Sequence, residues 1–163
     1  MEIDGLGSFR KTARGYRFQP QDQPRVFIAY VNEDAEFAGR MFDSLAEAGF
    51  DPWMDRRKLL PGQNWPRAIQ NALETSDFAV AFFSGRSIRK RGGFQAEIRY
   101  ALECARRLPL DEVFLLPVRL EPCPVPVDVA RFVQYVDLFP DWEQGVEKLR
   151  QVINQQVRKR QAA

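Results

Sequence analysis

One glutamate stands out in this 163-residue chain because of its place on a predicted helix. Phe94, Ile98 and Ala101 recur at helical spacing, and Glu97 flanks the apolar stripe that they form. A carboxylate at the border of a core and a cleft is partly buried, and partial burial can shift its pKa toward values useful in catalysis. From position alone, the alternative is a solvated glutamate on the shoulder of a helix.

The residue types of the chain exclude several classes of catalytic and binding site. There is no histidine, which removes serine–histidine triads, HExxH zinc sites and any imidazole base. The two cysteines, Cys104 and Cys123, are too few for a disulfide framework or a four-ligand zinc site, so no metal is expected. Neither GxxxxGK[ST] nor GxGxxG follows a strand. The available chemistry therefore rests on carboxylates.

The charge of the chain is nearly balanced. It has 24 basic and 22 acidic residues, a formal net charge of +2, which argues against dedicated nucleic-acid binding. No stretch is long and apolar enough for a membrane span, and the first residues lack the apolar core of a signal peptide. Two cysteines and no leader predict a protein of the reducing cytoplasm.

The composition and the pattern of the sequence change at Arg25. Residues 1–24 hold glycines and prolines among scattered charges without a sustained period, so we expect a flexible tail or linker there. Apolar runs then predict five strands, at 26–30, 50–54, 78–83, 113–120 and 132–139. Helical spacing predicts four helices: one over 38–46 that stops at Gly49, then 65–75, 94–107 and 141–157. Residues 158–163 are read as a short basic tail.

Alternating strands and helices with apolar strands predict an α/β fold, a five-stranded parallel sheet with helices on both faces. The expected strand order is 2-1-3-4-5, which puts a ligand-binding switch point between the first and third strands. The first strand ends there at the polar run Asn32-Glu33-Asp34. Together with Glu97, this run predicts a nucleotide pocket whose chemistry depends on one carboxylate. A phosphoacceptor receiver domain would need an aspartate where this chain has Phe83-Ser84.

An ordered set of short motifs resembles the Toll/interleukin-1 receptor (TIR) domain of the bacterial, NAD-cleaving type. The set comprises FIAY at 27–30 with Glu33-Asp34, GFDPWMD at 49–55, LLPG at 59–62 with Trp65, Ser76-Asp77, Phe83-Ser84, FQAE at 94–97, PVRL at 117–120 and DLF at 137–139. The resemblance runs from about residue 25 to 153, and the domain is placed at 25–157. It implies a flavodoxin-like three-layer sandwich.

The resemblance also implies an activity: release of nicotinamide from NAD, leaving ADP-ribose or a cyclic form of it. Glu97 takes the place of the catalytic glutamate, and NAD is the substrate with no cofactor. Nicotinamide in NAD is already a cationic leaving group, so no general acid is needed. One carboxylate can hold the ribose hydroxyls and stabilise an oxocarbenium-like transition state.

Other positions are carried over from the family as substrate contacts or as an assembly loop. The substrate contacts are Tyr30, Asn32, Asp55, Trp65, Ser84, Ser87 and Phe94; the assembly loop holds Arg57, Leu59, Leu60, Pro61 and Gly62. Many relatives carry a tryptophan where this chain has Gly93, and Phe94 stands beside it. Structural alternatives are packed aromatics for Tyr30 and Trp65, and turn or cap residues for Asp55 and Ser87.

The expected partners are NAD, further copies of the chain through TIR–TIR contacts, and a sensor domain or activating protein. The expected setting is an effector in bacterial immune or antiphage defence or signalling. One alternative is a TIR interaction or adaptor module that works by assembly without catalysis. Another keeps the glutamate but changes the substrate to a nucleoside or nucleotide that lacks the second half of NAD.

Overall fold

The computed structural model describes residues 2–3, 7–12, 15–19, 23–54, 65–89, 93–109, 112–131 and 134–162. For residues 2–19, 65 and 93 the description is of the backbone alone.

A five-stranded parallel sheet forms the centre of the domain. Its strands are β4 (Arg25–Ala29), β5 (Asp51–Trp53), β6 (Phe78–Phe83), β7 (Leu115–Arg119) and β8 (Val136–Asp137). They lie in the order β5-β4-β6-β7-β8, and every neighbouring pair is parallel. Numbered along the chain this order is 2-1-3-4-5, which confirms the predicted flavodoxin-like topology and its switch point between β4 and β6.

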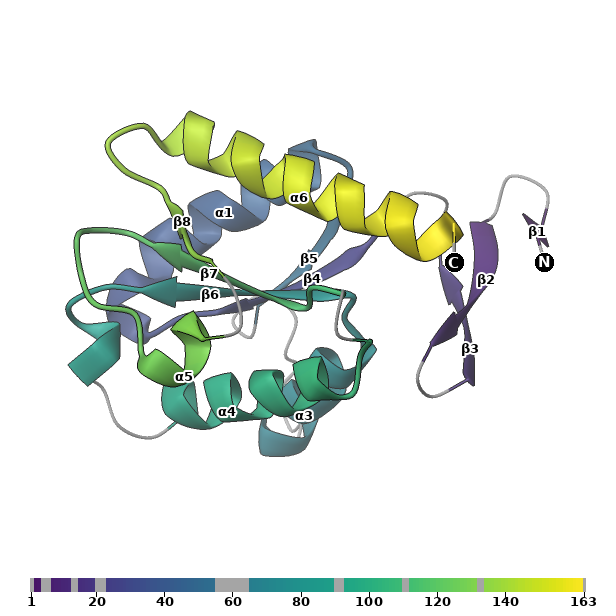
Figure 1. The fold of residues 1–163 in the computed structure, drawn as a ribbon, viewed down its shortest axis with the longest axis horizontal. Coiled ribbons are helices and arrows are strands. Elements are labelled where there is room, and N and C mark those ends of the chain that lie inside the picture. The colour runs from purple at the N-terminus through teal and green to yellow at the C-terminus, as the bar shows by residue number, and fades with distance from the viewer. Residues whose placement is uncertain are drawn as a thin grey trace.

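Helices cover both faces of this sheet (Figure 1). On one face lie α1 (Ala35–Glu47) and α6 (Trp142–Ala162); on the other lie α3 (Trp65–Thr75), α4 (Gly93–Arg106) and the short α5 (Val127–Ala130). The predicted α3 is confirmed residue for residue, and α6 runs about five residues further than predicted. The result is the expected three-layer sandwich.

The alternation of side chains along the strands divides the core in two. In β6, Phe78, Val80 and Phe82 belong to the cluster under α1 and α6, whereas Ala79, Ala81 and Phe83 belong to the cluster under α3 and α4. All six are at most 1% exposed. A central parallel strand is buried on both faces, which explains why this run reads as continuously apolar.

Two segments differ from the elements that the sequence predicted. No strand was predicted in residues 1–24, which were expected to be a flexible tail or linker, but β1 (Glu2–Ile3), β2 (Gly7–Thr12) and β3 (Gly15–Gln19) form a separate antiparallel sheet there. In its register Phe9 lies opposite Phe18, and the signal that was missed is the alternation of Tyr16 and Phe18 with polar residues in β3.

The last strand, expected over 132–139, has only Val136 and Asp137 in the ladder with β7. The helix α5 precedes this segment and follows Pro126, in a stretch where no element was predicted. After β8 come Leu138 and the cis bond between Phe139 and Pro140, and proline cannot donate to a ladder. The apolar character of 132–139 is therefore shared between a short edge strand and its connections.

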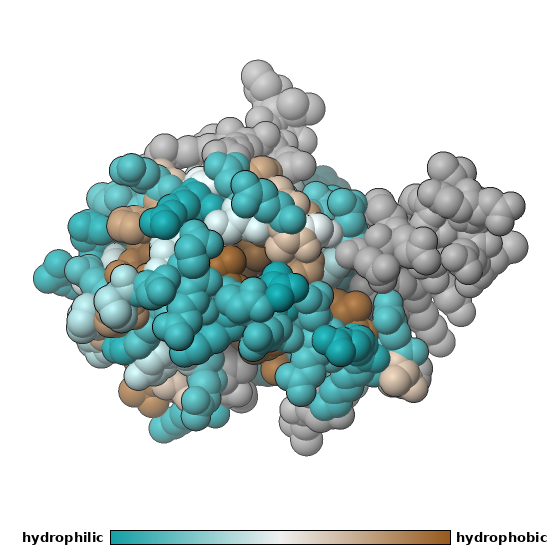
Figure 2. Space-filling model, turned by 90° about the horizontal axis from the view of Figure 1, so that it is seen from above, coloured by the Kyte–Doolittle hydropathy of each residue, from teal (hydrophilic) through white to brown (hydrophobic). Residues whose placement is uncertain are grey.

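The surface over α1 and α6 is mostly hydrophilic, with hydrophobic residues in small patches among the polar ones (Figure 2). Within the described residues, no helix combines the length and the apolar character needed to cross a membrane.

Candidate functional site

Glu97 lies near the start of α4, at the carboxyl edge of the sheet. The connection from β6 to α4 places the first turn of α4 at this edge, where open parallel sheets bind ligands. Phe94, Ile98 and Ala101 turn inward and are 5%, 4% and 1% exposed, while Glu97 beside them is half-buried. The carboxylate therefore lies at the border of the core.

The flank of α4 that carries Glu97 faces α3. Tyr100, three residues further along this flank, donates a hydrogen bond from its hydroxyl to the carboxylate of Glu74 on α3. The two helices are in contact and both begin at the carboxyl edge of the sheet. The start of α3 at Trp65 is thus at the same end of the seam between the helices as Glu97, and residues 55–64 lead into it.

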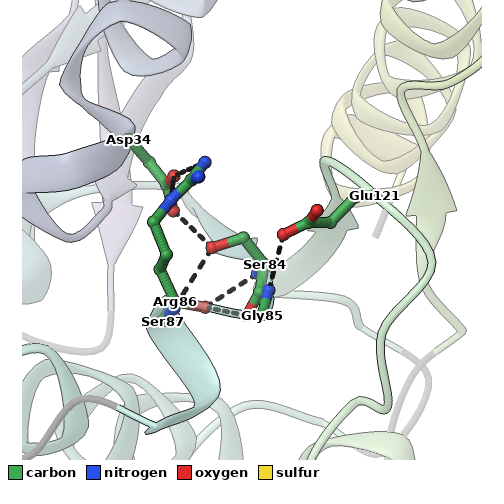
Figure 3. Close-up of polar contacts among 6 residues, drawn as sticks. All are labelled: Asp34, Ser84, Gly85, Arg86, Ser87 and Glu121. Carbon is green, nitrogen blue, oxygen red and sulfur yellow. Dashed lines mark hydrogen bonds and ion pairs between the residues drawn. The ribbon is translucent and has the colours of Figure 1, made fainter.

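A buried carboxylate joins the loops that follow β4 and β6 (Figure 3). Asp34 ends the short 3₁₀ helix η1 (Asn32–Asp34) and is 0% exposed. Its Oδ2 accepts from the Ser84 hydroxyl at 2.7 Å, and its Oδ1 accepts from Arg86 Nε at 3.1 Å and Nη2 at 2.8 Å. The hydrogen bond to Asp34 raises the pKa of Arg86 above its ordinary value.

The loop after β7 joins the same cluster. The carboxylate of Glu121 accepts from the backbone N–H of Gly85 at 2.8 Å (Figure 3). The negative charges of Glu121 and Glu33 also raise the pKa of Arg86. The loops after three neighbouring strands are therefore held together around the segment that leads from β6 toward α4.

Sequence reasoning missed Asp34, Arg86 and Glu121 as parts of this cluster. The signal was present for Asp34, because it lies in the polar run that ends the first strand at the switch point. No local pattern marks Arg86 or Glu121, since their pairing joins positions that are 52 and 36 residues from their partners.

The predicted substrate residues differ in their burial and in their contacts. Ser84 and Ser87 are each 0% exposed and bond to each other, and the Ser84 hydroxyl also donates to Asp34. Phe94 packs edge-on against Phe83, with ring centroids 5.9 Å apart. Direct contact of these three side chains with a substrate stays a prediction, and the structure gives each of them an internal partner.

Tyr30 and Asn32 differ from these three. Tyr30 is partly buried against the cluster under α1 and α6, and its contact with a substrate stays a prediction. Asn32 is exposed at the carboxyl edge. The remaining predicted residues lie outside the described part of the chain. They are Asp55, Arg57, Leu59, Leu60, Pro61, Gly62 and the side chain of Trp65.

No group of three cysteine, aspartate or glutamate side chains in the described ranges is placed to hold a metal ion. Cys123 is buried near the loop after β7, and burial raises the pKa of its thiol above the ordinary value. Burial of this kind keeps a thiol protonated and unreactive at neutral pH.

Comparison with known families is consistent with this geometry. The family model of the TIR domain matches residues 26–150. The chain belongs to the TIR domain family. A protein of Sinorhizobium fredii, the uncharacterized protein y4cD, is 27% identical to it over 139 residues. These residues make up 85% of this chain and 21% of y4cD, so the chain spans about a fifth of that relative.

Solved structures share the fold of this TIR domain. A metazoan TIR-STING receptor from C. gigas, in complex with 2',3'-cGAMP, superposes with a TM-score of 0.67 at 23% identity. The match covers 78% of this chain and 38% of that one. The CMP N-glycosidase BcmB of Clostridium botulinum superposes with a TM-score of 0.55 at 18% identity, over 77% of this chain and 96% of that enzyme.

Proposed function

We propose that this TIR domain is an NAD glycohydrolase with Glu97 as its catalytic carboxylate. The observation that carries the proposal is the position of Glu97: half-buried, near the start of α4, on the flank facing α3 and beside the switch point of the sheet. Membership of the TIR family supports it, and the CMP N-glycosidase of similar fold supports the class of bond that is cut.

The reaction needs little from the protein besides charge and positioning. The bond between the nicotinamide nitrogen and C1′ of the ribose breaks, and its electron pair leaves with nicotinamide, which becomes neutral. Positive charge then develops at C1′, where the Glu97 carboxylate stabilises it while accepting hydrogen bonds from ribose hydroxyls. Water adds to C1′ and loses a proton to give ADP-ribose; attack by a nitrogen of the adenine gives the cyclic product instead.

We further propose that the domain acts as an effector in bacterial defence or signalling and is activated by assembly with other copies. The matched segment is a fifth of y4cD, so a TIR segment of this type can be joined to other parts of a longer protein that could act as a sensor. A second candidate function is a TIR module that recruits other TIR domains without catalysis.

The decisive experiment follows loss of NAD and release of nicotinamide by chromatography, at high protein concentration with a crowding agent. Wild type is compared with Glu97→Gln and with Glu103→Gln, a matched change at an exposed glutamate of the same helix. We expect Glu97→Gln to lower kcat at least about 100-fold and Glu103→Gln to leave it within about twofold of wild type. Thermal unfolding of each variant checks that the fold is kept.

Equal turnover by wild type and Glu97→Gln would remove the catalytic assignment. If neither protein cleaves NAD while both still self-associate, the adaptor function is supported instead. Cleavage of nicotinamide mononucleotide or CMP in preference to NAD would move the substrate to the nucleotides that lack the second half of NAD.

A further inference from the structure

The cluster around Asp34 contains a charge that is removed from water. The Asp34 carboxylate is 0% exposed and accepts hydrogen bonds from one hydroxyl and from two nitrogens of a guanidinium (Figure 3). Because the Arg86 side chain is 48% exposed, its attraction to Asp34 is screened by water and adds little to the stability of the fold. The hydrogen bonds to Asp34 fix the positions of their donors, because each bond requires its donor at one distance and angle.

The segment that Asp34 contacts is itself closed by hydrogen bonds. The backbone N–H of Ser84 donates to the Ser87 hydroxyl at 2.8 Å, and the N–H of Ser87 donates to the Ser84 hydroxyl at 3.1 Å. The Ser87 hydroxyl donates in turn to the carbonyl of Ser84 at 3.2 Å. The Ser84 hydroxyl thus accepts from Ser87 and donates to Asp34, so one carboxylate fixes the whole turn to the loop after β4.

The same turn is packed against the start of α4. The turn continues into the 3₁₀ helix η2 (Ser87–Arg89), and Ile88 packs against the cluster that contains Phe83 and Phe94. Phe83 ends β6 and Phe94 lies in the first turn of α4, and their rings are in contact. Glu97 follows Phe94 by three residues on that helix. A displacement of the turn would therefore shift Phe94 and, on the same helix, the carboxylate of Glu97.

We infer that Asp34 is a positioning residue: through Ser84 and Arg86 it fixes the turn 84–89 against the loop after β4, and so holds the first turn of α4 with Glu97 at the switch point. The catalytic part of this inference rests on the proposed NAD cleavage. The structural part does not, because it concerns only which segment Asp34 holds in place.

The test uses the full chain and four variants. Asp34→Asn keeps the shape of the side chain but presents an NH₂ group to donors that need an acceptor. Ser84→Ala removes one hydroxyl and leaves the pair of Asp34 with Arg86, so it is the milder change, and the double variant reports whether the two act through one contact. Asp128→Asn, at an exposed aspartate of α5, is the control for loss of one negative charge.

Amide hydrogen exchange and NAD kinetics are measured on each protein. We expect Asp34→Asn and Ser84→Ala to speed exchange at least about tenfold in residues 84–89 and the first turn of α4, with β6 and α6 unchanged. We expect kcat to fall at least about tenfold while KM stays within about threefold, because a displaced carboxylate loses more in the transition state than in substrate binding. The double variant should be no slower than the more affected single variant.

The inference is overturned if exchange speeds up uniformly across the domain, which would show a purely stabilising role. It is equally overturned if the turn and α4 keep wild-type exchange, or if kcat per folded molecule is unchanged in an active protein. A wild type that does not cleave NAD would remove the proposed function, and the exchange pattern alone would then support or overturn the positioning role of Asp34.

Discussion

At the scale of single residues, Arg119 forms a second charged pair at the carboxyl edge, with Asp137, and also contacts two aromatic rings. Arg119 donates to both oxygens of Asp137, at 2.6 and 2.9 Å, and to the carbonyl of Cys123 at 3.0 Å. Its guanidinium lies over the rings of Tyr135 and Phe139, at 4.3 and 5.5 Å from their centroids. One side chain thus ties the end of β7 to β8 and to the loop between them.

The Arg119–Asp137 pair predicts a definite pH dependence of stability. The hydrogen bond from Arg119 lowers the pKa of Asp137 below its ordinary value. For a carboxyl whose folded pKa is lowered, the stabilisation is fully present above the unfolded value of about 3.9 and is lost as pH falls through the folded value. Asp137→Asn should therefore lower the free energy of unfolding at pH 7 by on the order of 1 kcal/mol, a modest figure because Asp137 is 35% exposed.

Urea unfolding of wild type and Asp137→Asn, at about pH 7 and about pH 3, measures this effect. The difference between the two proteins should shrink at the lower pH, because below about 3.9 the unfolded wild-type chain takes up a proton at this aspartate before the folded chain does. Asp128→Asn serves as the exposed control. A difference that stays constant between the two pH values would show that Asp137 stabilises the fold by shape and not by charge.

At the scale of elements, the approach of α6 to β8 depends on a glycine. Gly145, in the first turns of α6, lies against the strand that precedes the helix. A Cβ atom placed there would lie 2.6 Å from the carbonyl oxygen of Asp137, 2.7 Å from Leu138 Cδ2 and 3.1 Å from Leu138 Cα. Two of these three atoms belong to the backbone, so the helix can come this close only without a side chain.

Gly145→Ala should destabilise the domain although alanine is the better helix former. Alanine gains about 1 kcal/mol of helix propensity, but the clash with backbone atoms forces α6 away from β8, and we expect a net loss of roughly 1 to 3 kcal/mol. Gly85→Ala is the matched control, since its new Cβ would meet the flexible carboxylate of Glu121 at 3.3 Å. Equal unfolding midpoints for Gly145→Ala and wild type would show that the helix can shift without cost.

The elements also show what the sequence allows to be predicted. The boundaries of α3 and β6 follow from strong local patterns, a helical stripe and a continuous apolar run, that tertiary contacts reinforce. The two-residue β8 and the N-terminal hairpin do not follow, because their extent depends on pairing with another strand and not on composition. The site divides in the same way: Glu97 is visible from helix periodicity, whereas the bond between Ser84 and Asp34 joins residues 50 positions apart.

At the scale of the whole molecule, we expect the proposed activity to depend on contact between copies of the domain. The seam between α3 and α4 begins at Trp65, at the end of the two helices near which Glu97 lies. If a neighbouring copy completes the site there, mass action requires the rate per molecule to rise with protein concentration. A site complete within one chain would give a rate per molecule that is independent of concentration.

Leu60→Asp tests this requirement, because a charge in the proposed assembly loop should weaken contact between copies. We expect it to lower the rate per molecule at least about tenfold at low protein concentration and to leave a steeper dependence on concentration. Val127→Asp makes the same apolar-to-acidic change at a residue of α5 that is 64% exposed, and it should leave the rate within about twofold of wild type. Sedimentation of both variants beside the rate measurements connects activity with assembly. A flat rate per molecule in the wild type would place the complete active site in one chain, and equal losses in the two variants would show that the effect comes from added charge and not from the loop.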